Sequence, residues 1–316
     1  MFKKVNNPIL FQGDLNKKKY FEGWYYKQVS LESKKVISFI PGISLNKRDP
    51  HAFIQIIEAM PVQTYYFKYD INDFKFGNEP FYIKIGNSIF SRKGVSVSIK
   101  DSNYNIQGEV TFGDFQSIGT SLYMPNIMGP FAYLPNMDCN HGVVSMNHSV
   151  DGKLEVNHDE FSFEKDKGYL EKDWGKTFPN KYIWLQGNNF KNPNASFMCS
   201  IANVPFMGVS FTGLIANLNV DGIEYRFATY NNSKILKVAV LDNKTNITLK
   251  RGDITLHIEA RVSHTGELKA PINGEMNDVI KEGLGGKISL KLISGKRTLN
   301  VLETEYAGIE TVGNWN

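Results

Sequence analysis

The sequence predicts an all-β fold made of two tandem antiparallel β-barrels, and three observations support this. From Tyr20 onward, short runs rich in β-branched and aromatic residues alternate with clusters of Gly, Pro, Asn and Asp. Aromatic residues make up 13% of the chain, with 21 Phe and 15 Tyr, which suits β-structure and wide apolar pockets. The order of the runs in the first half returns in the second half, as expected for a duplicated unit.

The predicted strands of the first half follow an irregular arm at residues 1–19. Each is a short run with one apolar face, typical of an antiparallel strand. Pro41-Gly42 is expected to stop the second run. The runs are 23–29, 36–40, 52–57, 64–69, 81–85, 95–99 and 108–112.

The second half repeats these features at an offset of roughly 160 residues, which indicates an internal duplication. Trp24 is echoed by Trp184, and the run at 95–99 by the run at 254–258. We therefore predict two domains, 1–175 and 176–316, each with about eight or nine strands closing into a lipocalin-like barrel that can hold one small ligand. A sandwich is the alternative. The best helical candidate is 276–282, ended by Gly283.

The first copy carries an insertion of about 20 residues relative to the second, at 115–141. This segment is dense in Pro, Gly, Met and aromatic residues, a composition that favours a lid or ligand-contacting loop. An apolar plug between the domains is the alternative, and docking on a partner or a membrane is a third.

Composition excludes several function classes. The net charge is +4 and both signs are interspersed, so no nucleic-acid partner is expected. No apolar run approaches the ~18 residues of a membrane span, which predicts a cytoplasmic protein and leaves peripheral membrane contact open. Cys139 and Cys199 lack metal or disulfide spacing, and the six His lack HxH or HExxH spacing, so we expect no metal. A phosphate-cradle motif is missing, so nucleotide use is not expected, and the lack of a Gly-x-Ser-x-Gly motif gives covalent catalysis no support.

Candidate chemistry lies in carboxylates among aromatic residues. In the stretch Gly168–Gly175, Glu171 and Asp173 fall about 7 Å apart on one strand face, whereas Leu170, Lys172 and Trp174 fall on the other. A carboxyl group walled by aromatic rings loses solvation of its charged form, so its pKa rises and it can act as a general acid. Aromatic faces also stabilise a carbocation.

A second such stretch is 21–26, where Glu22, Trp24 and Tyr26 share a strand face; a structural role as a barrel plug is the alternative for Trp24. The second copy keeps Glu310 at the position of Glu171 but lacks a counterpart of Asp173. The recurring Glu is therefore interpreted as architectural, and Asp173 as the functional acid.

Three motifs together resemble the tocopherol cyclase family. They are Phe21-Glu-Gly-Trp-Tyr-Tyr-Lys27, Pro135-Asn-Met-Asp-Cys-Asn-His-Gly-Val-Val-Ser-Met146, and Gly168-Tyr-Leu-Glu-Lys-Asp-Trp-Gly-Lys-Thr-Phe-Pro179 followed by Trp184-Leu-Gln-Gly-Asn188. The resemblance runs from about residue 15 to the C-terminus. More distantly, the third motif is similar to that of carotenoid hydratase proteins with paired lipocalin-like barrels. Gly187 departs from the family, which often has Cys there.

The resemblance implies a cofactor-free enzyme that closes a chromanol ring on a prenylated hydroquinone, an intramolecular lyase reaction of the isomerase class. An acid protonates the first double bond of the prenyl tail, and the phenolic oxygen captures the resulting tertiary cation. Asp173 is the implied acid, with Glu22 or Glu171 second. The implied substrate-binding residues are Trp24, Tyr26, Asn140, His141, Tyr169, Trp174, Trp184, Gln186 and Asn188.

An isoprenoid quinol is accordingly the expected partner, and a non-catalytic carrier of hydrophobic molecules is the alternative function.

Overall fold

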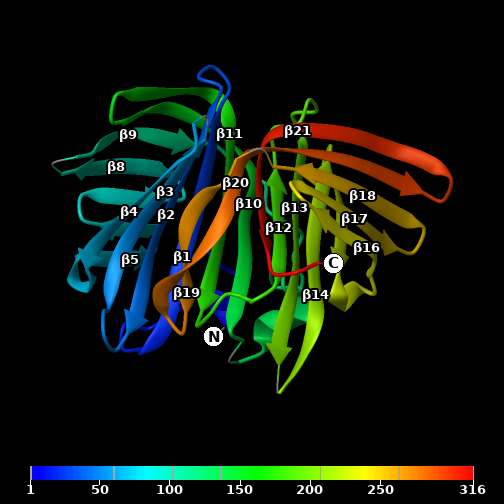
Figure 1. The fold of residues 1–316 in the computed structure, drawn as a ribbon, viewed down its shortest axis with the longest axis horizontal. Helices are drawn as coiled ribbons and strands as arrows, with labels where there is room; N and C mark the ends of the chain where they lie inside the picture. The colour runs from blue at the N-terminus through cyan, green and yellow to red at the C-terminus, as the bar shows by residue number, and fades with distance from the viewer. Residues whose placement is uncertain are drawn as a thin grey trace.

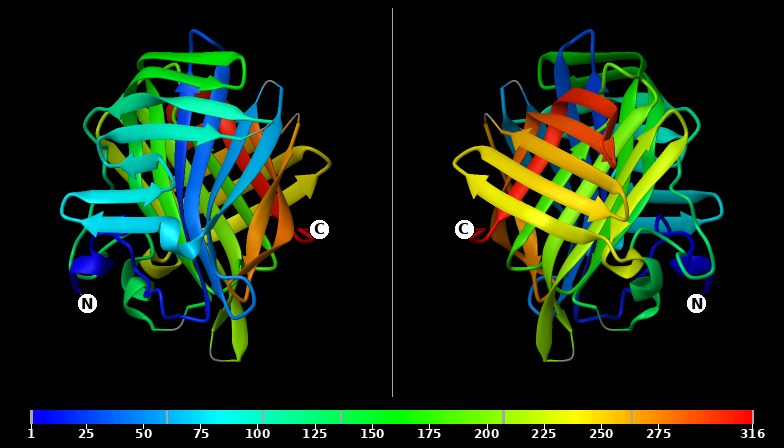
Figure 2. Two further views of the ribbon diagram at one scale, coloured as in Figure 1. Left: turned by 90° about the vertical axis from the view of Figure 1, so that its left-hand side faces the viewer. Right: turned by 90° about the vertical axis from the view of Figure 1, so that its right-hand side faces the viewer.

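The computed structural model describes residues 2–59, 61–101, 103–135, 137–206, 208–262 and 264–315. These residues form two large curved antiparallel sheets that lie side by side (Figure 1). Figure 2 shows the molecule from its two sides, with the first sheet toward the viewer on the left and the second sheet on the right. The predicted all-β class and the paired lipocalin-like barrels are confirmed.

The first sheet has eleven strands in the order β4-β3-β2-β1-β11-β10-β9-β8-β7-β6-β5. The strands are β1 (Lys19–Ser30), β2 (Lys35–Asn46), β3 (His51–Ala59), β4 (Gln63–Asp70), β5 (Phe74–Asn78), β6 (Phe81–Ile85), β7 (Ser88–Ser91), β8 (Gly94–Lys100), β9 (Asn105–Phe112), β10 (Cys139–Val156) and β11 (Asp159–Gly175). The short helices in this half are α1 (Phe2–Val5), η1 (Ile71–Asp73) and η2 (Gly129–Tyr133).

The second sheet has ten strands in the order β15-β14-β13-β12-β21-β20-β18-β17-β16, with β19 also paired to β20. The strands are β12 (Tyr182–Gly187), β13 (Ala195–Phe206), β14 (Val209–Val220), β15 (Ile223–Ala228), β16 (Lys234–Leu241), β17 (Lys244–Arg251), β18 (Ile254–Arg261), β19 (Gly266–Ile272), β20 (Glu275–Ser294) and β21 (Arg297–Val312). The helix η3 (Thr229–Asn231) follows β15.

Each sheet encloses its own apolar core, because alternate residues of every strand point to its concave face. Trp24, Tyr26 and Leu170 belong to the first core, and Ile183 and Leu185 to the second. The residues between them on these strands point outward, toward the other sheet. The space between the two sheets is therefore a third packing layer.

The second strand does not stop at Pro41-Gly42 as predicted. Strand β2 runs through this pair to Asn46, with Pro41 opposite Ile54 and Gly42 opposite Phe53 in the ladder. A Cβ atom at Gly42 would lie 2.4 Å from the ring of Phe53, so glycine serves a close approach here and not a turn.

The predicted helix at 276–282 is wrong, because the whole segment belongs to β20. Glu282 pairs with Gly266 in β19 and with Glu310 in β21. Strand pairing on both sides thus overrides the short helical pattern, as tertiary context does for weak local propensities.

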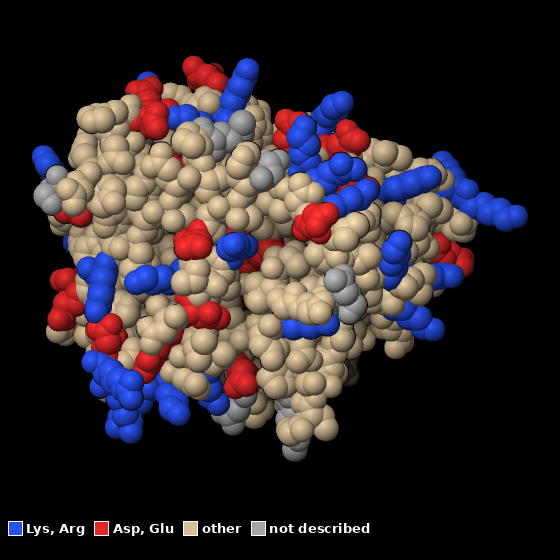
Figure 3. Space-filling model, viewed as in Figure 1, with Lys and Arg blue, Asp and Glu red and all other residues tan. Residues whose placement is uncertain are grey.

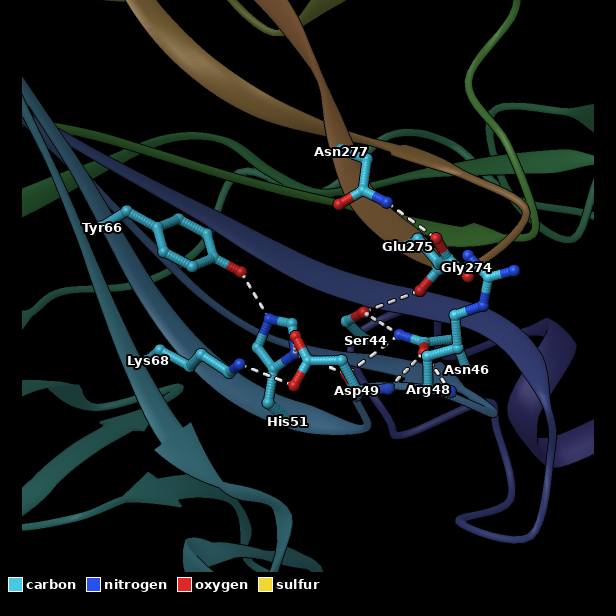
Figure 4. A network of polar contacts seen from close by, with 10 residues as sticks. All are labelled: Ser44, Asn46, Arg48, Asp49, His51, Tyr66, Lys68, Gly274, Glu275 and Asn277. Atoms are coloured by element: carbon cyan, nitrogen blue, oxygen red, sulfur yellow. Dashed lines mark hydrogen bonds and ion pairs between the residues drawn. The ribbon is translucent and has the colours of Figure 1, made fainter.

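The β19–β20 hairpin crosses to the first sheet and ties the two halves together (Figure 1). At its tip, the Ser44 hydroxyl donates to the carbonyl oxygen of Gly274 at 2.7 Å, beside the cluster of Asn46, Asp49 and His51 shown in Figure 4. Farther along, the backbone N–H of Lys269 donates to Gln55 Oε1 at 2.7 Å. The two sheets change over between Gly175 and Tyr182, and the predicted folding domains 1–175 and 176–316 stay a prediction.

The N-terminal arm is packed into the first barrel. Ile9, Leu10 and Phe11 are buried in its core, and the indole Nε1 of Trp24 donates to the carbonyl oxygen of Ile9 at 2.7 Å. Trp24 therefore anchors the arm, which agrees with the structural alternative for this residue.

The surface seen in Figure 3 carries Lys, Arg, Asp and Glu side chains in mixed order, without a large area of one sign. Among the described residues, the helices are all too short or too polar to cross a bilayer.

Candidate active site between the two barrels

A pocket of about 190 Å³ lies between the outward faces of the two sheets. Its wall is mostly apolar, with aromatic and methionine side chains from both halves and from the inserted loop. These are Phe21, Phe53, Met128, Phe131, Met137, Phe178 and Phe211. Four carboxyl groups and one imidazole face this apolar space: Glu171, Asp173, Glu282, Glu310 and His141.

The alternation predicted for Gly168–Gly175 explains how two of the acids reach the pocket. Leu170 and Trp174 pack in or against the first barrel core, whereas Glu171 and Asp173 point outward and line the pocket. On the neighbouring strand β10, His141 stands opposite Asp173 in the ladder and faces the same way.

His141 bridges the two acids. Its Nδ1 lies 2.9 Å from Asp173 Oδ1, and its Nε2 lies 3.2 Å from Glu171 Oε2. The second distance suits an ion pair, although the N–H direction does not meet hydrogen-bond geometry. Burial alone would lower the pKa of His141, but the charges of Glu171 and Asp173 outweigh it and raise the pKa well above its ordinary value. The ring is therefore an imidazolium held between two carboxylates.

Glu171 is fixed by donors from both halves. The Tyr169 hydroxyl donates to Glu171 Oε2 at 2.5 Å, and Trp184 Nε1 in the second half donates to the same oxygen at 3.1 Å. Its hydrogen-bond partners are thus side chains at the pocket that come from both halves, and its architectural role stays an interpretation.

Glu282 and Glu310 form a second acidic pair on the second sheet. The hydroxyl of Tyr25 donates to Glu282 Oε1, and that of Tyr182 donates to Glu310 Oε2 at 2.7 Å. Burial is the main cause that raises the pKa of Glu282 to about 7. Burial, followed by the charge of Glu282, also raises the pKa of Glu310 well above its usual range.

Lys27 lies on the same outward face of β1 as Tyr25 and is fully buried. Its Nζ donates to Gln186 Oε1 of the second half at 2.6 Å. Burial lowers the pKa of Lys27 to about 7, against the charges of Glu282 and Glu171, which raise it.

One group of metal-ligand type occurs among the described residues: His141, Glu171 and Asp173, whose ligand atoms lie within 4.8 Å of one another. Each ring nitrogen of His141 faces a different carboxylate. A single metal ion could therefore bind only one of the two nitrogens in this ring orientation. The contacts that these three side chains make with one another are those of an ion-pair bridge.

The structure brings four of the predicted site residues into the pocket and a fifth beside it. His141, Glu171, Asp173 and Trp184 line the pocket, and Tyr169 contacts it through Glu171.

Glu22, Trp24 and Tyr26 do share a strand face, but that face lines the interior of the first barrel. Glu22 is fully buried there, accepts from the backbone N–H groups of Gln12 and Gly13, and pairs with Lys172. The predicted alternation is therefore present, but these three side chains face the barrel interior and do not line the pocket between the sheets.

The other predicted binding residues have structural partners outside the pocket. Asn140 Nδ2 donates to the carbonyl oxygen of Trp174 at 3.3 Å, and Asn188 Nδ2 donates to that of Gly168 at 2.8 Å. Gln186 is buried, and its side-chain Oε1 accepts a hydrogen bond from Lys27 Nζ. Trp174 packs against the first barrel core with the ammonium of Lys172 over its ring at 4.9 Å.

Sequence reasoning missed Tyr25, Tyr182, Glu282 and Glu310 as site residues. Tyr25 lies inside the motif Phe21–Lys27, and Glu310 recurs at the position of Glu171, so both residues carry a signal in the sequence. Glu282 was hidden by the helical interpretation of 276–282.

The repeat alignment also needs a correction. Trp24 points into the first barrel, whereas Trp184 points out of the second barrel and packs on Tyr25 at 5.4 Å between ring centroids. Trp184 therefore corresponds in orientation to Tyr25, one residue away from the predicted match.

The inserted loop contributes directly to the site. Met128, Phe131, Met137, Cys139 and His141 all line the pocket and belong to the predicted segment 115–141. Met128 and Met137 also belong to the apolar cluster between the sheets. The loop therefore both lines the pocket and packs in the apolar cluster between the sheets, and its contact with a ligand stays a prediction.

Comparison with known proteins supports the family resemblance. The sequence matches the family described as tocopherol cyclase-like over residues 98–313, which is more than half of the chain. The chain therefore belongs to the tocopherol cyclase-like family. Curated protein sequences give no match.

Solved structures with the same fold cover nearly the whole chain at low sequence identity. A candidate AttH protein from Nitrosomonas europaea has a TM-score of 0.57 at 14% identity, covering 94% of each chain. CghA has a TM-score of 0.57 at 9% identity, covering 94% of this chain and 90% of its own. Kievitone hydratase from Nectria haematococca has a TM-score of 0.50 at 10% identity, covering 93% and 89%. At these identities the likeness shows the fold alone.

Proposed function

We propose that this member of the tocopherol cyclase-like family is a cofactor-free enzyme that closes a chromanol ring on a prenylated hydroquinone by proton transfer. The observation that carries the proposal is a mostly apolar pocket that nevertheless holds four carboxyl groups and an imidazole. A pocket built only to hold a lipid has no use for buried acids, which are costly to desolvate. Proton transfer to an apolar substrate does need them.

The reaction is balanced by one proton added and one removed. A carboxyl O–H gives its proton to the double bond of the prenyl tail nearest the ring, and a tertiary cation forms at the other carbon. A lone pair of the phenolic oxygen forms the C–O bond, and the phenolic O–H gives its proton to a carboxylate. The electron-rich faces of Trp184 and Tyr25 border this space and stabilise the cation.

We assign the phenolic end of the substrate to Asp173, His141 and Glu171. The Asp173 side chain is 26% exposed and the Glu171 side chain 5%, so Asp173 is the more accessible proton acceptor. The imidazolium of His141, whose two ring nitrogens face Asp173 and Glu171, holds these carboxylates in place at this end of the pocket. We therefore propose Asp173 as the base that takes the phenolic proton, in place of the role of alkene-protonating acid that the family resemblance implies.

The test is incubation of the protein with prenylated hydroquinones of different tail lengths in D2O. The expected product is a chromanol carrying one carbon-bound deuterium, identified by mass and NMR. Asp173→Asn is expected to lower kcat by about 10²-fold or more, as for loss of a general base. Asp159→Asn, an exposed acid on the same strand β11, is the matched control and keeps activity.

A carrier of hydrophobic molecules is the second candidate, and the apolar wall of the pocket favours it. Mass spectrometry of lipid extracted from the purified protein, followed by prolonged incubation with it, separates the two. Bound quinol that returns unchanged would support the carrier. A product heavier by one water would instead show that water captures the cation, which would make the protein a hydratase.

A further inference from the structure

Glu282 and Glu310 face each other across two neighbouring strands. They are ladder partners on β20 and β21, so their Cβ atoms lie on one face at roughly 4.5–5.5 Å. Both side chains line the pocket. Trp184 is the ladder partner of Glu310 on the next strand, β12, so the acidic pair and the indole form one row across the second sheet.

The surroundings of this pair offer hydrogen bonds but little compensating charge. Tyr25 donates to Glu282 and Tyr182 donates to Glu310. Glu282 is fully buried, and its second oxygen, Oε2, has no hydrogen-bond partner among the residues that the structure describes. A buried, unpartnered carboxyl oxygen beside an apolar pocket is poised for a ligand or a proton.

The charged groups that face the pair come from three strands. Lys27 on β1 is the nearby cation, and its Nζ is already engaged by Gln186. Glu171 and Asp173 on β11 add negative charge, and they belong to the group that His141 neutralises. Two carboxylates at this spacing in a desolvated site do not both ionise.

We propose that Glu282 and Glu310 share one proton and are the acid that protonates the substrate double bond. The carboxyl O–H bond breaks, a C–H bond forms from the alkene π electrons, and the dyad is left with one more negative charge. The phenolic proton released on ring closure goes to Asp173, and solvent exchange returns it to the dyad. This assignment deepens the proposed function and rests on it.

The two acidic groups then have separate roles set by their environments. The group on the first sheet is bridged by His141, whereas the hydrogen-bond donors to the pair on the second sheet are the neutral hydroxyls of Tyr25 and Tyr182. Paired acid and base catalysts typically lie in one pocket but in different environments, which separate their pKa values. Trp184 lies between them, with its N–H on Glu171.

Infrared difference spectroscopy tests the shared proton without any substrate. At pH 7 we expect the C=O band of a protonated carboxyl group, sensitive to D2O, in the wild type and in Asp173→Asn. The band should shift in Glu282→Gln and in Glu310→Gln and disappear in the double variant. A band that persists in the double variant overturns the shared proton.

Kinetics test the catalytic role with a prenylated hydroquinone that the wild type converts. Each single variant is expected to lower kcat by about 10²-fold or more and to leave the Kd for the quinol, measured by tryptophan fluorescence, within about threefold. Glu303→Gln, an exposed acid on β21, is the control. Full activity in either single variant overturns the role. If the wild type converts no quinol but the infrared result stands, the proposed function fails and the shared proton survives.

Discussion

The indole Nε1 of Trp184 lies 3.1 Å from Glu171 Oε2, and this hydrogen bond joins the second sheet to the first inside the pocket. Trp184 is also the ladder partner of Glu310, so its side chain lies beside the second acidic pair while it donates to the first group. The site is therefore assembled only when the two halves are docked. The bond between Tyr25 and Glu282, which runs between the same two sheets, has the same consequence.

Trp184→Phe is expected to lower kcat about tenfold or more while the fold is kept. The substitution keeps an aromatic face but removes the donor to Glu171, and a hydrogen bond to a charged group contributes about 1.5–3 kcal/mol. Steady-state kinetics and thermal unfolding measure the two effects. Trp315→Phe removes an indole donor whose acceptor is the backbone carbonyl oxygen of Val312 and not an acid, and should leave kcat unchanged. Equal losses in both variants would contradict a specific role for Trp184.

Activity should fall as pH rises through about 7, because the pKa of Glu282 lies near that value and the acid must be protonated. Stability should change in the same direction. A carboxyl group whose pKa is raised in the folded state stabilises fully below its unfolded value of about 4.5, and this contribution is lost as pH rises through about 7.

The Glu282→Gln variant removes this titration and provides the check on stability. It should be less sensitive to pH than the wild type, and relatively more stable above pH 8, because no charge has to be buried at position 282. Urea unfolding at pH 5, 7 and 9 measures the difference. If the wild type instead gained stability relative to the variant from pH 5 to pH 9, the pKa of Glu282 would be lowered on folding, which would contradict the prediction.

Glu22→Gln should reduce stability and leave the chemistry intact. Glu22 and Lys172 are a buried ion pair in the first barrel, with Lys172 also over the ring of Trp24 at 4.6 Å. Removing one charge leaves Lys172 buried without its partner, which costs about 3–5 kcal/mol.

Denaturant unfolding measures this loss, and kcat per folded molecule should match the wild type, because Glu22 is not at the pocket. Glu160→Gln, on an exposed pair with Lys153, is the control and should change stability by less than about 1 kcal/mol. A kcat that falls with unchanged stability would return Glu22 to the catalytic residues.

The sequence predicts more of the fold than of the candidate site. Alternation within Gly168–Gly175 correctly separates Glu171 and Asp173 from Leu170 and Trp174, because the side-chain period of a strand is fixed. Periodicity does not say which face meets a ligand. In a lipocalin-like barrel the interior is the expected binding space, and here the interior is filled by Trp24, Tyr26 and their neighbours.

The pocket could not be derived because it lies between two convex faces and depends on how the halves dock. Glu282 illustrates this: it reaches Tyr25 only because the β19–β20 hairpin crosses to the first sheet. Docking of this kind follows from contacts more than two hundred residues apart in sequence, such as the 257-residue separation of Tyr25 and Glu282. Local patterns do not report such distances.

His141→Ala should lower kcat by about 10²-fold, and added imidazole should restore part of it. The substitution removes the cation that bridges Glu171 and Asp173, so Asp173 is no longer held in place to accept the phenolic proton. Imidazole can enter the space that the ring vacates and restore the bridge.

A chelator such as EDTA should leave wild-type activity unchanged, because both ring nitrogens are engaged by carboxylates. Loss of activity with EDTA, recovered by adding a divalent cation, would instead make His141, Glu171 and Asp173 a metal centre.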